Sequence, residues 1–115
     1  MRNSMYAAAA AVALLAAAPA AHAQGAASPE FKKLMGLMAV GVASQMCGAD
    51  MSPAVHDRVE QAASALAAEQ KGFTMDQVNA GLDGMATNMA KNQASVCAGV
   101  QKEGIDAVAT AKLEE

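Results

Sequence analysis

Cys47 and Cys97 are the two cysteines of the chain, and their even number and their context limit the chemistry that they can do. An even count of cysteines in a small domain with an export signal, described below, favours a disulfide. Two free thiols or two metal ligands are the alternatives. Zinc requires about four ligands, whereas residues 24–115 offer only these cysteines and one histidine, His56. We therefore predict a Cys47–Cys97 disulfide.

Methionine and histidine together could bind a soft metal. Thioethers with a histidine are suited to Cu(I), and Met46, Met51 and His56 lie within one short stretch. These three residues are the candidate metal ligands of the chain. The alternative is that methionine fills a core poor in aromatic side chains. We favour this second interpretation because most methionines recur at helical spacing, and we expect no cofactor.

The same methionines could form a surface for other molecules. Flexible, polarizable side chains suit a groove that accepts varied apolar partners. Five residues at helical spacing are the candidates for the core or for such a binding surface: Met35, Met38, Leu82, Met85 and Met89.

Ser52, His56 and Asp57 have the residue types of a catalytic triad but an unsuitable spacing. Adjacent residues on a helix do not face each other, and Ser52 is better explained as a helix cap. No serine is surrounded by the glycines of a nucleophile elbow. The sequence therefore predicts no catalytic residue here.

Two carboxylate pairs each share one helical face: Asp57 with Glu60, and Glu103 with Asp106. Neither pair lies in a recognisable metal-binding loop. We interpret both as solvated surface, and we predict that the protein is not an enzyme.

The N-terminus has the parts of a secretory signal. Arg2 supplies a positive charge, residues 7–18 are apolar without interruption, and the small residue Ala23 suits the cleavage position. A membrane-spanning helix needs about 20 apolar residues, which this run does not reach, and a lipoprotein would need a cysteine at the cut. We expect residues 1–23 to be a signal peptide, and the protein to reach the periplasm or the extracellular space.

The chain after the signal is long enough for one domain. Residues 24–115 hold seven basic and eleven acidic residues, a formal net charge of −4, with no basic stripe. Nucleic-acid binding is therefore disfavoured, and we expect a protein partner and no membrane anchor after cleavage. The remaining aromatic residues are Phe31 and Phe73, so the core must be thin. We predict a short disordered segment, 24–28, and a single helical domain, 29–113.

The first predicted helix spans residues 29–47. Ser28, Pro29 and Glu30 are a cap, an N1 proline and an acidic first-turn residue in the expected order. No charge occurs between Lys33 and Asp50, so we expect this helix to be central and the most buried. A membrane-active helix is the alternative, but it would need a basic polar face. The apolar positions are Phe31, Leu34, Met35, Met38, Val42 and Met46.

The second predicted helix spans residues 53–71. Ser52 and Pro53 repeat the cap-and-proline signal, and Gly72 is a suitable C-terminal stop. One stripe of the helix is apolar and consists of Val55, Val59, Ala62, Ala63 and Leu66.

The third predicted helix begins at residue 75 and runs to about Cys97. Thr74 and Gln77 have capping-box spacing, and Phe73 and Val78 flank them as a hydrophobic staple. An apolar seam runs along this helix, with Asn92 as its polar interruption, through Met75, Val78, Leu82, Met85, Met89 and Val96.

Gly99 and Gly104 predict a kink or break after the third helix, because each glycine costs up to about 1 kcal/mol inside a helix. A final short helix should then return Ile105, Val108 and Leu113 to the core.

These elements predict an all-α fold, a small antiparallel bundle of three main helices plus a short C-terminal helix. Short connections make neighbouring helices antiparallel, so Cys47 and Cys97 should reach the same end of the bundle. Their disulfide would close a loop of about 50 residues, worth on the order of 4 kcal/mol.

An export signal, a small helical domain and the long-range pair Cys47 and Cys97 together resemble the HdeA-type acid-stress chaperones of the bacterial periplasm. Similar small disulfide-stapled helical proteins of the periplasm share this pattern. The chain departs from the group in its low aromatic content and in lacking lysine-rich termini. The resemblance implies that acid protonates the carboxylates and loosens the bundle, while the disulfide limits unfolding.

Three functions are therefore compatible with the sequence. The first is a small exported helical binding protein that acts as an HdeA-like chaperone. The second is a dedicated protein-interaction partner of the inhibitor or immunity type. The third is a copper-binding protein that uses methionine and His56.

Overall fold

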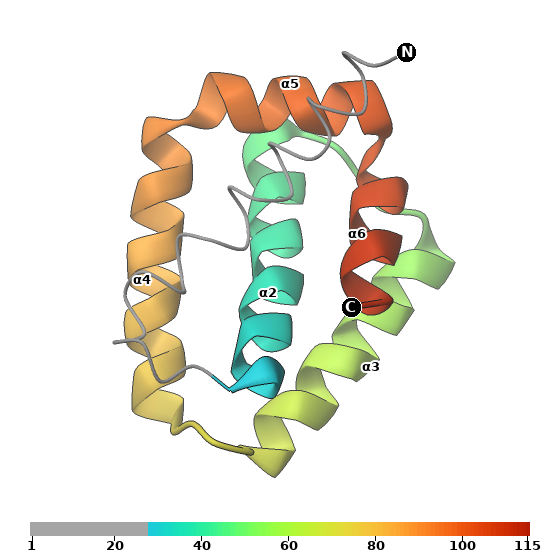
Figure 1. Cartoon of the computed structure of the whole chain (residues 1–115). Helices are drawn as coiled ribbons and strands as arrows, with labels where there is room; N and C mark the ends of the chain where they lie inside the picture. The colour runs from blue at the N-terminus through green and yellow to red at the C-terminus, as the bar shows by residue number, and fades with distance from the viewer. Residues whose placement is uncertain (1–27) are drawn as a thin grey trace.

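Five helices make up the described part of the chain, residues 28–115, in the computed structural model (Figure 1). They are α2 Pro29–Cys47, α3 Pro53–Glu69, α4 Met75–Lys91, α5 Gln93–Glu103 and α6 Ile105–Leu113. No strand occurs in this part, which confirms the all-α class, and none of its helices is long and apolar enough to cross a bilayer. The predicted signal peptide, and the predicted disordered segment up to residue 27, lie outside the described residues.

Local signals at both ends set the bounds of α2. The Ser28 Oγ accepts a hydrogen bond from the Phe31 N–H at 3.1 Å. At the other end Gly48 has a φ of 62°, the left-handed conformation that closes a helix at little cost for glycine. The Ala49 N–H then donates to the Ser44 carbonyl at 2.9 Å. The predicted helix 29–47 is confirmed.

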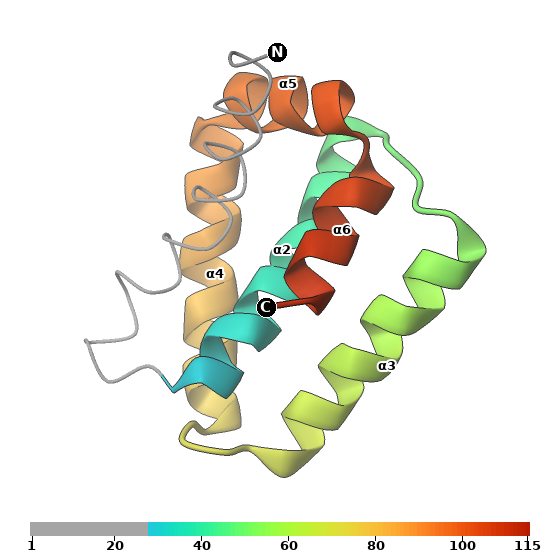
Figure 2. The same cartoon turned by 45° about the vertical axis from the view of Figure 1, so that its right-hand side comes forward.

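The other four helices all pack against α2. Both views show α4 on one side of α2 and α3 on the other, with α5 crossing one end (Figures 1 and 2). More residues are buried on α2 than on any other described helix, in agreement with the expectation that it is central: Phe31, Leu34, Met35, Gly36, Leu37, Ala39, Val40 and Ala43.

Two details of the second helix differ from the prediction. Ser52 occupies the N-cap position of α3 but its side chain makes no capping hydrogen bond; its backbone N–H donates instead to the Asp106 Oδ1 at 2.9 Å. The helix ends at Glu69 rather than at residue 71, because Gln70 adopts the left-handed conformation with a φ of 48°. Gly72, with a φ of 79°, lies in the following turn.

The predicted capping box of the third helix is confirmed at the start of α4. The Thr74 N–H donates to the Gln77 Oε1 at 2.8 Å, and the Gln77 N–H donates to the Thr74 Oγ1 at 3.2 Å. Phe73 and Val78, the predicted staple, are both buried in one cluster.

The predicted third helix is wrong beyond Lys91, where a break at Asn92 separates α4 from α5. The Asn92 backbone has φ −116° and ψ 26°, and its Nδ2 donates to the Asn88 carbonyl at 2.8 Å. This side chain competes for a backbone carbonyl, as asparagine does at helix ends. The chain therefore turns at the polar interruption of the predicted seam, and α5 leaves in a new direction (Figure 1).

Of the two glycines expected to break the chain, only Gly104 does so. Gly104 has a φ of 86° and separates α5 from α6, whereas Gly99 lies inside α5 and is buried. Ile105 and Val108 of α6 are buried and Leu113 is half-buried, in agreement with the prediction. The described part thus has five helices, because the predicted third helix is divided into α4 and the start of α5, and the predicted bundle of three main helices with one short final helix is not confirmed.

The core consists of two clusters. The first cluster lies between α2 and the four other helices and contains Leu37, Ala39, Val40, Ala43, Val59, Met85, Met89, Val96, Val100, Ile105, Val108 and Ala109. The second cluster lies near the start of α2 and contains Phe31, Leu34, Met35, Phe73 and Val78. Its two aromatic rings are tilted against each other with centroids 5.5 Å apart.

Candidate interaction surface

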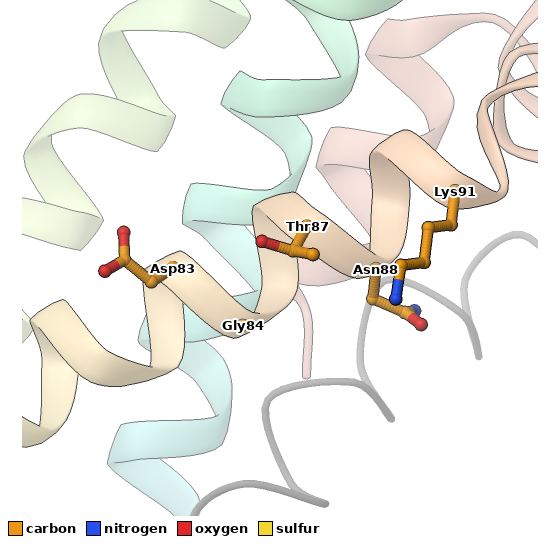
Figure 3. Close-up of a pocket in the computed structure, with 5 residues that line it drawn as sticks. All are labelled: Asp83, Gly84, Thr87, Asn88 and Lys91. Carbon is orange, nitrogen blue, oxygen red and sulfur yellow. The ribbon is translucent and has the colours of Figure 1, made fainter.

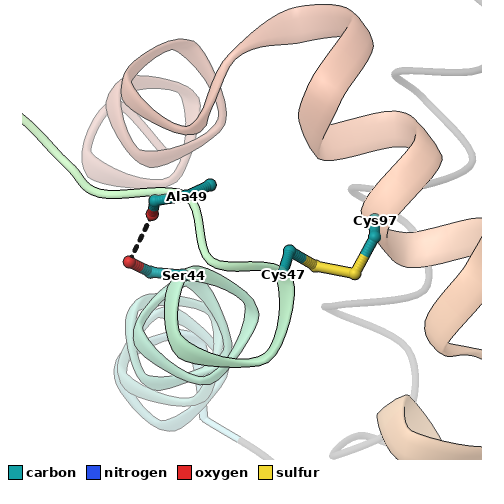
Figure 4. Close-up of a disulfide and its surroundings, with 4 residues drawn as sticks. All are labelled: Ser44, Cys47, Ala49 and Cys97. Carbon is teal, nitrogen blue, oxygen red and sulfur yellow. Dashed lines mark hydrogen bonds between the residues drawn. A yellow bond between two sulfur atoms is a disulfide. The ribbon is translucent and has the colours of Figure 1, made fainter.

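Cys47 and Cys97 form a disulfide, as predicted, with Cα atoms 5.3 Å apart (Figure 4). The bond joins the last residue of α2 to α5, the helix that crosses the end of the molecule. Beside it, the Ser44 Oγ donates a hydrogen bond to the Ala49 carbonyl at 2.6 Å and holds the turn after α2 (Figure 4). The central apolar helix is therefore fastened at its C-terminal end.

Three of the five candidate core or binding residues lie wholly in the core. Met35, Met85 and Met89 are each 0% exposed. Met38 and Leu82 are half-buried and pack against the first cluster. Met75, which was expected to begin the seam of the third helix, is 39% exposed; it is the first residue of α4, and the buried side chains of that helix begin one turn later.

The helix α3 covers the core with small side chains. Val59 is its one buried residue. The rest of the predicted apolar stripe is half-buried and packs against the two clusters, together with Ala67: Val55, Ala62, Ala63 and Leu66. The structure confirms that this stripe faces the core. Its side chains are less buried than the apolar side chains of α2.

The copper candidates face different surroundings. Met46 and Met51 are half-buried against the first cluster. The His56 side chain is 51% exposed, and its Nε2 lies 3.3 Å from the Glu60 Oε1. Within residues 28–115 no three His, Cys, Asp or Glu side chains are grouped to hold a metal ion. The packing of both methionines favours their role as core filler.

The residues considered for a catalytic triad do not form an enclosed site. The His56 Nδ1 is 4.0 Å from the Asp57 Oδ1, and both side chains are largely exposed. Ser52 stands at the N-cap of α3. The exposure of His56 and Asp57 favours the interpretation of these groups as surface residues.

One of the four carboxylates interpreted as surface has a tertiary role. Asp106 is half-buried and accepts the hydrogen bond from Ser52, whereas Glu103, Asp57 and Glu60 are exposed. The solvated-surface interpretation is therefore wrong for Asp106. No local pattern could have shown this, because the donor lies 54 residues earlier in the chain.

A buried lysine, Lys112, was also missed by the sequence pattern. Its side chain is 1% exposed, and its Nζ lies 3.1 Å from the Glu115 Oε2. The aliphatic part of Lys112 runs over Gly36, where a Cβ would lie only 3.0 Å from the Lys112 Cδ. Gly36 thus provides the space in which α6 approaches α2.

A polar hollow of about 300 Å³ lies along α4 (Figure 3). Its described lining residues are Asp83, Gly84, Thr87, Asn88 and Lys91, all from one face of that helix. They include no nucleophile paired with a base, so the hollow has no evident catalytic chemistry.

Comparisons with protein-family models, with curated proteins and with solved structures find no match to this chain. Its function is therefore inferred from the geometry described above and from the sequence pattern.

Proposed function

We propose that this protein is a small exported helical binding protein of the chaperone type. In acid it exposes apolar surface and holds unfolding proteins, as the resemblance to the HdeA-type chaperones implies. The observation that carries this proposal is the Cys47–Cys97 bond, which fastens the apolar central helix α2 to α5.

The charge balance supplies the driving force for loosening. Residues 28–115 contain all eleven carboxylate side chains and the seven basic side chains that lie beyond the export signal. Model carboxyl groups titrate near pH 4. At about pH 2–3 the carboxylates lose their charge, and the basic residues repel one another without compensation. Acid therefore favours an expanded state.

The disulfide limits this expansion. It closes a loop of 50 residues that contains all of α3 and α4, and it costs the unfolded chain on the order of 4 kcal/mol of entropy. An expanded molecule therefore keeps α2 and α5 together. Because α2 has no charge after Lys33, it would present continuous apolar surface to an unfolding protein.

Export is part of the proposal. Disulfides persist in oxidising compartments, which supports the expectation that residues 1–23 direct the chain to the periplasm or outside the cell. The mature protein would begin at Gln24.

The test is an aggregation assay with the chain 24–115. An unrelated periplasmic protein is brought to about pH 2–3, and light scattering is followed with and without equimolar chain. We expect suppression by the oxidised protein and its loss in Cys47→Ser. A protein that stays compact and does not change the scattering contradicts the proposal.

A pull-down at neutral pH provides the complementary observation. A chaperone should recover no single stoichiometric partner under these conditions. Recovery of one such partner, with no activity in acid, would contradict the chaperone function and support a dedicated inhibitor or immunity-type protein.

A further inference from the structure

Among the described helices, α3 is the least embedded. One of its 17 residues, Val59, is buried, whereas α6 buries four of its nine residues and α2 buries eight of 19. Stability differs between regions of a protein, and elements with few buried contacts open first. We therefore expect α3 to detach at a lower cost than the rest of the molecule.

The apolar contacts of α3 are also small. Three of its half-buried side chains are alanines, Ala62, Ala63 and Ala67, and its two larger half-buried ones are Val55 and Leu66. The stabilisation from burial scales with the apolar area removed from water. This helix therefore buries little apolar area for its length against the surface on which it packs, which we call its seat.

Few polar contacts hold α3 to other helices. At its start the Ser52 N–H donates to the Asp106 Oδ1 of α6. After its end the Ser28 Oγ donates to the Lys71 carbonyl at 2.8 Å, in an exposed position. The ion pairs of α3 in the described part are local, within the helix or with Lys71 next to it. Such exposed pairs contribute little.

Beneath α3 lie both core clusters. Leu66 and Ala63 pack against the first and the second cluster, and Val59 belongs to the first. Departure of α3 would uncover parts of both clusters, while the Cys47–Cys97 bond and the packing of α4, α5 and α6 on α2 remain. The uncovered seat is then an apolar surface of the length of a helix.

We propose that α3 is a displaceable cover, and that its seat accepts an amphipathic helix of an unfolding protein in its place. This inference rests on the proposed function and names the surface that a bound protein occupies. The occupant is defined by α3 itself, a helix with one apolar stripe. The stripe of the replacing helix should be free of charge, because the residues that the α3 stripe packs against belong to the two apolar clusters, to which α2 contributes no charge between Lys33 and Asp50.

The seat can adapt to larger side chains than those of α3. Met38 of α2 is half-buried and packs against both clusters, and methionine is the most adaptable apolar side chain. A helix with leucine at the stripe positions would bury more area than alanine does and could therefore compete with α3.

The first test compares two valine variants of the chain 24–115. Val59→Ala loosens α3, whereas Val96→Ala makes the same chemical change in the buried core of α5. The probe is a fluorescent peptide of the length of α3, with leucine at helical 3–4 spacing and serine or glutamine elsewhere. A scrambled peptide of equal composition is the control.

We expect Val59→Ala to raise the affinity for the probe roughly fivefold, because the affinity depends on the fraction of molecules with an open seat. Val96→Ala should change it much less at a matched loss of thermal stability. Equal gains in both variants would overturn the inference, since general loosening would then account for binding.

Hydrogen exchange of the complex separates this inference from the proposed function. With the probe bound, amides of α3 should lose protection while those of α2 keep it. If aggregation is suppressed in acid but α3 stays protected, the displaceable cover is wrong and the chaperone function stands. If the peptide displaces α3 but no aggregation is suppressed, the seat is correct and the chaperone function is wrong.

Discussion

The Asp106 carboxylate accepts a hydrogen bond from the Ser52 backbone N–H at 2.9 Å and so joins the first turn of α6 to the start of α3. The two helices are far apart in sequence but pack against each other. Asp106 also lies in the first turn of α6, where a negative charge is favourable. One half-buried side chain thus supports two helix starts.

Removal of this carboxylate should loosen the start of α3. Hydrogen bonds to charged groups contribute roughly 1.5–3 kcal/mol, and because Asp106 is only half-buried we expect Asp106→Ala to cost about 1–2 kcal/mol. Urea unfolding measures the loss, and hydrogen exchange should locate it in the first turns of α3. Asp106→Asn keeps an acceptor and is the control. Equal exchange in both variants would show that the charge, not the hydrogen bond, is important.

The disulfide should contribute a large part of the stability. Its loop of 50 residues corresponds to about 4 kcal/mol in the chain-entropy model, which is comparable with the total for many small domains. We expect Cys47→Ser and Cys97→Ser to lower the melting temperature by similar amounts, and the double variant to add little. Mass spectrometry of the native protein without reductant should show a chain lacking two hydrogens. Free thiols at both positions would contradict the bond and the oxidising compartment proposed from it.

The capping box of α4 offers a local test. Thr74→Ala removes the acceptor of the Gln77 N–H and should cost about 1 kcal/mol. Thr87→Ala makes the same change at an exposed position inside the same helix and should be neutral or slightly stabilising, since alanine has the better helix propensity. Chemical denaturation of both variants is sufficient. A cost at Thr87 as large as that at Thr74 would argue against the cap as the cause.

Features that depend on neighbouring residues could be predicted from the sequence. The cap at Ser28, the capping box at Thr74 and the break at Gly104 each arise from the conformational preference of one or two side chains. The Cys47–Cys97 bond followed from the cysteine count and from the direction of the helices. The central position of α2 followed from its lack of charge.

The break at Asn92 and three features that depend on distant residues could not be predicted. Asn92 looked like one polar position in a seam, and only the structure shows the change of direction there. Asp106 and Lys112 have ordinary surface patterns, yet one accepts a hydrogen bond from Ser52 and the other is buried over Gly36. The shallow packing of α3 could not be predicted either, because an apolar stripe indicates which face of a helix turns to the core but not how deeply that face is buried.

The contact between Gly36 and Lys112 gives a prediction with a matched control on the same helix. A Cβ at Gly36 would lie 3.0 Å from the Lys112 Cδ and 3.6 Å from its Cε, whereas at Gly41 nothing lies within 4 Å. Alanine in place of a helical glycine gains up to about 1 kcal/mol. We expect Gly41→Ala to show this gain in urea unfolding, and Gly36→Ala to show none or a loss, because overpacking offsets it.

A double-mutant cycle identifies the lysine as the cause. Lys112→Ala removes the side chain that the Cβ added by Gly36→Ala would meet, so it should cost less in the Gly36→Ala background than in the native chain. The Nζ contact with Glu115 is lost in both backgrounds and therefore cancels. If Gly36→Ala stabilised the protein as much as Gly41→Ala, the Lys112 Cδ could not lie 3.0 Å from the position of a Cβ at Gly36. The close approach of α6 to α2 at Gly36 would then be wrong, and the burial of Lys112 would need another explanation.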